Sequence, residues 1–216
     1  EKDALLSVDY PTIVLLYALM VVSGQLRLGG FYTWVALKIS RLTERPAAFL
    51  LLVMLVSAVL SAVMVNDIIC LAFTPILAVA MLRAGLNPIP YLIGLAVASN
   101  IGSAATIIGN PQNMLIGQVG RLHFGDFLLW CAPPTLISLL LSYMLIEFLY
   151  RGRFKAAASA VGAQHESWPS FDRHQSTKGL VATLILMGLF FTPVPRELSA
   201  MTIAGLLLCS RRMQTR

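Results

Sequence analysis

The stretch LIGLAVASNIGSAATIIGNPQNMLIG, from Leu92 to Gly117, decides how this chain folds. It is apolar up to Ala98 and then carries small polar residues, glycines and a proline as far as Asn113. A membrane accommodates non-helical backbone only where that backbone lines a cavity or is buried in protein. We therefore expect a transmembrane helix that is broken over this run, with the gap holding a transported ion or substrate.

The overall composition indicates the class of protein. Of 216 residues, 57% are hydrophobic and 12% are charged, whereas soluble domains carry about 25% charged residues. The charges fall between apolar runs, and the alternation typical of a β-barrel is absent. We therefore predict an all-α, polytopic membrane protein embedded in a lipid bilayer. The net charge of +6 is spread over loops, so no nucleic-acid partner is expected.

The distribution of basic residues predicts the topology. If the first loop faces the cytoplasm, Lys2, Arg121 and Arg196 lie outside, which leaves 13 of the 16 Lys and Arg residues inside. This bias follows the positive-inside rule and predicts a multi-pass protein of the cytoplasmic membrane. It also requires the chain over residues 46–82 to return to the side that it left.

Apolar runs and their interruptions divide the chain into segments. We expect a span over 11–26, an interfacial helix over 31–42, a helical hairpin over 46–82, a broken helix over 90–119, a span over 127–150 and a cytoplasmic linker over 156–178. The second leg of the hairpin, 68–82, rises only about 22 Å, against a hydrocarbon core of about 30 Å. The tip of the hairpin is therefore expected inside the membrane, although two tight spans would give the same topology.

Asp67 is the only acidic residue far from every loop. A carboxylate at the centre of the membrane costs roughly 2.5–3.5 kcal/mol on insertion scales, so it needs a partner, a proton or a cation. In one interpretation, Asn66 and Asp67 cap the helix that starts at Ile68. In the other, Asp67 takes part in cation or proton coupling, and the two interpretations are compatible.

The broken stretch carries the residue types that a binding site needs. Unwound backbone exposes carbonyls that suit sodium, and a resuming helix offers N–H groups that suit an anion. The side chains expected to contribute are Ser99, Asn100, Ser103, Thr106, Asn110 and Asn113. A sodium ion is possible at Asn66, Asp67, Ser99 and Asn100. In the alternative interpretation, the small residues only let helices pack closely.

Glycines and prolines supply the backbone features of the candidate site. Gly102 and Gly109 permit close approach and unusual dihedral angles. Pro111 can begin the second half-helix at its first position, and Thr74-Pro75 can act as a hinge by freeing a carbonyl.

Enzymatic chemistry finds little support in the sequence. Only one Asp lies at membrane depth, the three His residues lie in loops, and the three Cys residues show no metal-ligand spacing. We expect neither an enzyme nor a resident cofactor, apart from sodium or protons as coupling ions.

Two motifs give the chain a family resemblance. Val65-Asn66-Asp67 with Thr74-Pro75, and Ser99 to Ser103 with Gly109 to Asn113, resemble the ion transporter superfamily. This superfamily includes arsenite permeases, D-type sodium/proton antiporters and divalent-anion/sodium symporters, and the resemblance is closest to its citrate-transporter-like anion permeases. It covers residues 9–178.

The resemblance implies a two-fold inverted repeat in which each half carries a re-entrant hairpin and a broken helix. The hairpin tip and the break would together bind sodium and one side of the substrate. Residues 1–155 would be the first repeat and 179–216 the beginning of the second, and both chain ends look cut. A second repeat, or a homodimer partner, would then complete the site.

These features predict a secondary active transporter for a small inorganic or carboxylate anion, coupled to sodium or protons. A sodium/proton antiporter with Asp67 as the shared site is the alternative. A third possibility, of a different class, is a non-transporting remnant or half-transporter.

Overall fold

The computed structural model describes residues 8–39, 45–155 and 171–209, and all regular secondary structure in these ranges is helical. The helices are α2 (Tyr10–Leu28), α3 (Phe31–Ile39), α4 (Pro46–Val63), α5 (Asn66–Arg83), α6 (Pro88–Ser103), α7 (Pro111–Val119), α8 (Phe124–Leu149), α9 (Arg173–Leu189) and α10 (Arg196–Leu208). Four of them, α2, α4, α5 and α8, are long and apolar enough to cross a membrane. The predicted all-α, polytopic membrane fold is confirmed.

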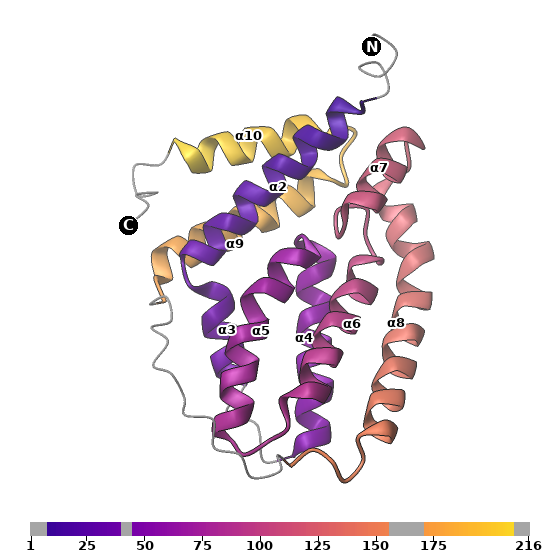
Figure 1. The fold of residues 1–216 in the computed structure, drawn as a ribbon. Coiled ribbons are helices and arrows are strands. Elements are labelled where there is room, and N and C mark those ends of the chain that lie inside the picture. The colour runs from indigo at the N-terminus through magenta and orange to yellow at the C-terminus, as the bar shows by residue number, and fades with distance from the viewer. Residues whose placement is uncertain (1–7, 40–44, 156–170, 210–216) are drawn as a thin grey trace.

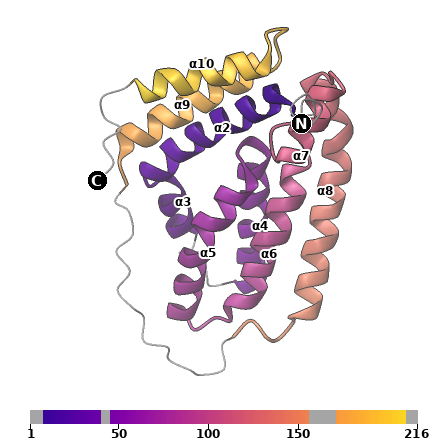
Figure 2. The same ribbon diagram turned by 45° about the horizontal axis from the view of Figure 1, so that its top comes forward.

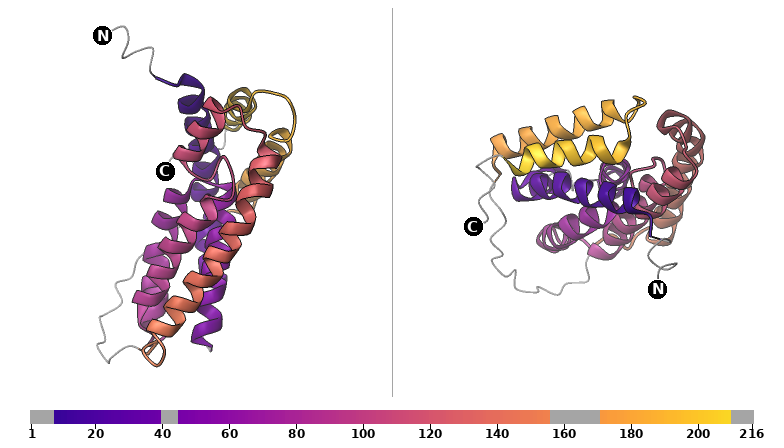
Figure 3. Two further views of the ribbon diagram at one scale, coloured as in Figure 1. Left: turned by 90° about the vertical axis from the view of Figure 1, so that its right-hand side faces the viewer. Right: turned by 90° about the horizontal axis from the view of Figure 1, so that it is seen from above.

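The helices form a bundle and a layer. Helices α4, α5, α6 and α8 run side by side along the bundle, and α2, α9 and α10 pack together across one of its ends (Figure 1). Figures 2 and 3 show the same layer from other directions. Each part has its own core, which includes Leu50 and Phe73 in the bundle and Leu15 and Leu186 in the layer.

Helices α4 and α5 form a hairpin whose tip is very short. Met64 and Val65 have extended backbone and separate the two helices, so the chain reverses direction over two residues (Figure 1). Each leg has 18 residues, a length of about 27 Å. Helix α6 packs against both legs. Because each leg approaches the length of a span, the re-entrant placement of the tip stays a prediction.

The broken helix consists of α6 and α7. They are separated by residues 104–110, which form turns and bends. Asn87 caps α6 by accepting from the backbone N–H of Ile89 at 3.1 Å, and a proline follows the cap at the start of each half. Pro111 thus occupies the first position of α7, where a missing N–H costs no helical hydrogen bond.

Helix α8 runs down the edge of the bundle (Figure 1). Its 26 residues extend about 39 Å, and among them Phe124, Leu139 and Ile146 are buried. Leu129, Trp130 and Phe148 are each more than 70% exposed. Such an apolar face suits contact with lipid tails.

The expected linker over 156–178 differs from the structure at its end. Helix α9 begins at Arg173, where Asp172 caps it by accepting from the backbone N–H groups of His174 and Gln175. The polar composition of 173–178 suggested a linker, but a good N-cap followed by tolerated helix formers starts a helix there. Residues 156–170 of the expected linker, and 40–42 of the expected interfacial helix, lie outside the described residues.

Candidate functional site

The hairpin tip lies against the break of the broken helix. The backbone N–H of Asn66, the first residue of α5, donates to the carbonyl of Gly109 in the break at 3.3 Å. Val65 is the N-cap of α5 and makes no side-chain capping bond. The interpretation of Asn66 and Asp67 as side-chain caps is therefore wrong, because both residues lie one position or more beyond the cap.

Ser99 connects α6 to both legs of the hairpin. Its hydroxyl lies 2.8 Å from the Ser61 hydroxyl on α4 and 3.2 Å from the carbonyl of Asn66. Ser61 and Ser99 are both fully buried. Sequence reasoning missed Ser61, although Ser57 and Ser61 stand four residues apart in an otherwise apolar leg and so share one helix face.

The side chains of Asn66 and Asn100 bridge the tip and α6. The Asn66 amide donates to the Asn100 carbonyl oxygen at 3.0 Å, and the Asn100 amide donates to the Ala96 carbonyl at 3.1 Å. Asn100 and Asp67 are both exposed. Among the described residues, the Asp67 side chain makes no hydrogen bond or ion pair. Its carboxylate, next to the positive end of α5, is thus a free oxygen ligand beside the tip.

Thr106 attaches the break to the end of α4. Its hydroxyl donates to the Ala62 carbonyl at 2.6 Å, and the side chain is 3% exposed. The last carbonyls of a helix have no partner within the helix. Thr106 therefore satisfies one of them at a buried position.

Asn110 and Asn113 close the break from the side of α7. The Asn110 side chain accepts from the Asn113 backbone N–H at 2.8 Å, which caps α7, and donates to the Ser103 hydroxyl at 3.1 Å. The Asn113 amide donates to the Thr106 carbonyl at 2.9 Å. Longer contacts, at 3.4 and 3.5 Å, join it to the carbonyls of Ser103 and Ala104.

These contacts change the expected chemistry of the break. Backbone carbonyls there were expected to be free for sodium, but the Asn113 amide, which has two N–H donors, lies within 3.5 Å of three of them and is nearest to that of Thr106. Of the first three residues of α7, Pro111 has no N–H and Asn113 is capped, so Gln112 alone keeps an uncommitted donor. Buried backbone groups need partners, and the site provides them internally.

The two glycines are required by close backbone contact. A Cβ on Gly102 would lie 2.3 Å from the Cα and carbonyl oxygen of Ala58, and one on Gly109 would lie 2.2 Å from the Ser103 carbonyl oxygen. The expected close approach is therefore present. Neither glycine has positive φ, so the expected unusual dihedral angles are not adopted.

The candidate hinge lies apart from this junction. Thr74 and Pro75 are exposed and sit within α5, which continues as a helix through Pro75. Eight residues of α5, or about 12 Å, separate Thr74 from Asn66. The missing N–H of Pro75 leaves the Leu71 carbonyl without its usual helical donor.

The junction offers mainly neutral oxygen and nitrogen groups. Among the described residues, no three His, Cys, Asp or Glu side chains cluster as metal ligands. Asp67 supplies a negative charge, while the serine, threonine and asparagine side chains supply dipoles. Such a donor set suits a hard, weakly held cation and does not suit a transition metal.

Comparisons with known proteins place the chain in a family of transporters. The family model described as "Citrate transporter" matches residues 1–216. An uncharacterized transporter of Mycobacterium tuberculosis is 33% identical over 143 residues, which cover 66% of this chain and 33% of that protein. A 46 kDa membrane protein of Mycobacterium leprae is 30% identical over 215 residues, covering 96% of this chain and 50% of that protein.

A plant protein is similar at a comparable level. The silicon efflux transporter of Oryza sativa is 32% identical over 148 residues, 68% of this chain and 30% of that protein. The chain thus spans half or less of the length of these relatives. It belongs to the citrate transporter family.

Proposed function

We propose that this member of the citrate transporter family is a secondary active transporter of the cytoplasmic membrane that moves a small inorganic or carboxylate anion, coupled to sodium or protons. One observation carries the proposal: the hairpin tip meets the break through crossing hydrogen bonds from Asn66, Ser99 and Thr106. A ligand held at this junction would touch two elements that could move together against the rest of the protein.

The uncommitted groups at the junction suggest how a cation and an anion would share it. Within the described part of the chain, the Asp67 carboxylate and the Asn66 side-chain oxygen accept no hydrogen bond, so they would be the first ligands of a sodium ion. The Gln112 N–H and the positive end of α7 would face the anion. A bound cation would also offset the repulsion between Asp67 and an anionic substrate.

The site needs a second side to hold a substrate. Asp67, Asn100 and Gln112, which lie on the helices next to the tip and the break, are exposed. The chain spans 30% to 50% of the lengths of the three relatives. We propose that a second repeat, or a second copy of the chain, covers these residues. The direction of transport could be outward, as the name of the rice relative suggests for that protein.

The direct test is transport by purified protein in liposomes. Labelled citrate, sulfate and arsenite would be offered in turn, with and without an inward sodium gradient and with and without a pH gradient. We expect one anion to accumulate only when a cation gradient is present. Liposomes containing the Thr106→Val variant are measured in parallel. This variant lacks the hydrogen bond between the break and α4 and should transport more slowly than the parent protein. Failure of every anion under every gradient would contradict transport by this chain alone.

Sodium/proton antiport is the second candidate, and the exposure of Asp67 favours it. A single uncommitted carboxylate can bind either a sodium ion or a proton, which is the requirement for exchange between them. The same liposomes, loaded with a pH-sensitive dye, report this activity when sodium is added without any anion substrate. Sodium-driven proton flux in the absence of anion would replace the anion proposal with this one.

A further inference from the structure

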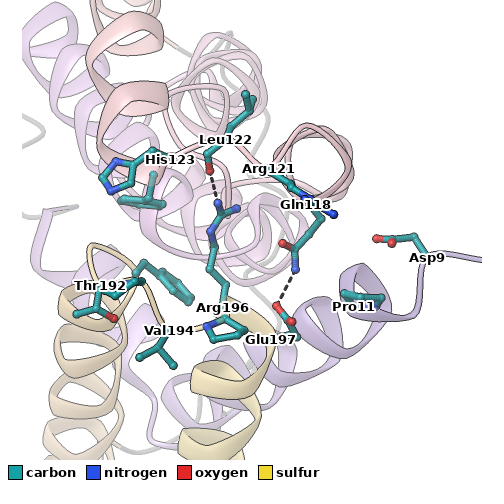
Figure 4. A pocket seen from close by; sticks show the side chains of 14 residues that line it. Asp9, Pro11, Gln118, Arg121, Leu122, His123, Thr192, Val194, Arg196 and Glu197 are labelled. Carbon is teal, nitrogen blue, oxygen red and sulfur yellow. Dashed lines mark hydrogen bonds between the residues drawn. The ribbon is translucent and has the colours of Figure 1, made fainter.

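A cavity of about 650 Å³ lies at the end of α7 that points away from the break (Figure 4). It is open to one side and is lined by the turn between α7 and α8, the turn between α9 and α10, and the start of α2. Its charged and amide side chains are Asp9, Gln118, Arg121, His123, Arg196 and Glu197. The volume lies within the range of small-molecule sites. The charge distribution of the sequence predicts that this end of the protein faces the outer side.

The two carboxylates of the cavity already have partners within the protein. Asp9 caps α2 by accepting from the backbone N–H of Thr12 at 3.1 Å. Glu197 accepts from the Gln118 amide at 3.0 Å, a contact drawn in Figure 4. Their demand for hydrogen-bond donors is thus partly met before any ligand arrives.

Arg196 places a positive charge in the wall, and none of the carboxylates that the structure describes is bonded to it. Its Nη2 donates to the neutral carbonyl of Leu122, and its Nη1 is buried against Gly117 and has no hydrogen-bond partner in the described ranges. Burial lowers the pKa of the Arg196 guanidinium below its ordinary value, and the adjacent Glu197 carboxylate offsets only part of this shift. An arginine keeps its proton in proteins, so the charge remains.

Arg121 occupies a backbone position that normally belongs to glycine. It has φ of 49° and follows the C-cap Gly120 of α7. The N–H of Leu122 bonds to the Gly117 carbonyl and that of Arg121 to the Gln118 carbonyl. This is the Schellman pattern, in which the left-handed residue is usually glycine. Helix α5 ends in the same pattern and has Gly85, with φ of 68°, at the equivalent position.

An arginine at such a position costs stability, because a side chain in the left-handed region is strained. The Arg121 side chain lines the cavity and makes no hydrogen bond or ion pair among the described residues. For the stability of this turn, glycine would therefore be a better residue than Arg121. Residues that conflict with the local backbone conformation, as Arg121 does here, occur mainly at functional positions.

We propose that this cavity is a loading site for a small carboxylate or oxyanion, in which Arg121 binds the anion and Arg196 provides a fixed positive charge. The chemical class of the ligand rests on the proposed function, but the site itself does not. The anion would bind here before it reaches the tip and the break. These lie at the other end of α7, whose nine residues extend about 13 Å.

The test follows anion binding at the cavity itself. In a variant whose three native cysteines are replaced by alanine, Thr192→Cys places a thiol on the exposed lining of the cavity. Labelling of this thiol by a charged reagent, in detergent and without sodium, is measured against increasing citrate or sulfate. We expect saturable protection, and Arg121→Gly should weaken the apparent affinity about tenfold or more, as expected for a lost charged hydrogen bond.

Two comparisons keep the result specific. Arg83→Gly, at the opposite end of the bundle, should leave protection unchanged, and Arg121→Gly should raise the unfolding temperature while it lowers affinity. The proposal is overturned if neither anion protects, if protection is unchanged in Arg121→Gly, or if that variant is less stable than the parent protein. Each outcome is independent of transport in liposomes, so failure here leaves the proposed function standing.

Discussion

The packing of α6 against α4 at Gly102 gives the sharpest prediction for the site. In Gly102→Ala the new Cβ would meet the Cα and carbonyl oxygen of Ala58 at 2.3 Å, and the carbonyl carbon at 2.6 Å. These are backbone atoms, so no side-chain rotation relieves the overlap and the two helices must separate. Overpacking of this kind costs typically 1–3 kcal/mol, and we expect the upper half of this range.

The assay is reversible unfolding of the purified protein in detergent, followed by circular dichroism. Gly24→Ala is the matched control, because it makes the same substitution inside helix α2, where a Cβ would meet nothing within 4 Å. Replacement of a glycine in the interior of a helix should stabilise the control by roughly 0.5–1 kcal/mol. The two variants should therefore move in opposite directions.

The same separation should impair the site, since Ser99 and Thr106 reach the hairpin from either side of Gly102. Transport by Gly102→Ala should fall while the protein still inserts into membranes. A Gly102→Ala protein that is as stable as the parent would refute the reasoning, because it would mean that α4 and α6 do not approach as closely as described.

Three further predictions concern single contacts. Asp67→Asn should leave membrane insertion intact and remove the dependence of uptake on sodium or pH in liposomes; unchanged ion dependence would exclude Asp67 from coupling. Asn110→Ala should lower the free energy of unfolding by about 0.5–2 kcal/mol because α7 loses its cap. Asn110→Asp keeps the capping oxygen and should recover much of this loss, so equal losses in the two variants would argue against the cap. Thr106→Val should cost about 1–3 kcal/mol because the buried Ala62 carbonyl loses its donor, and Thr106→Ser should not; the same unfolding assay decides both.

The sequence was sufficient for the order and type of the main elements. Long apolar runs, Asn-Pro pairs at residues 87–88 and 110–111, and the polar run after Ala98 predicted the membrane helices and the break. Pro111 could be placed because a proline in the first turn of a helix is a local signal, whereas the capping role of Asn110 was not predicted. The start of α9 was missed because polar residues that follow a cap have the same composition as a linker.

The contacts between elements could not be predicted from the residues alone. Ser61 and Ser99 meet because α4 and α6 pack in one register, and periodicity within each helix does not specify the register between helices. The same holds for Thr106 and the Ala62 carbonyl. Arg121 escaped notice for a different reason: the signal for its turn is glycine, and this chain has an arginine there.

The roles of Asn110 and Asn113 show the limit of arguing from residue type. Both were expected to face a ligand, and amides can do so. In the structure the Asn110 side-chain oxygen accepts from the first turn of α7, and the Asn113 amide donates to the Thr106 carbonyl in the break. A polar side chain in a membrane forms hydrogen bonds with buried backbone groups in preference to a substrate, because an unsatisfied backbone N–H or C=O group there costs several kcal/mol.

The central claim is that the hairpin tip and the break together hold the transported ion or anion. In a background without native cysteines, Asn100→Cys places a thiol at the exposed residue of α6 that accepts a hydrogen bond from Asn66 next to the hairpin tip. Its labelling by a charged thiol reagent is measured with and without the transported anion and sodium, and Arg83→Cys at the far end of α5 serves as the control. The account predicts that anion and sodium together slow labelling at residue 100 and leave residue 83 unaffected. Equal labelling rates at residue 100 under all conditions would contradict it.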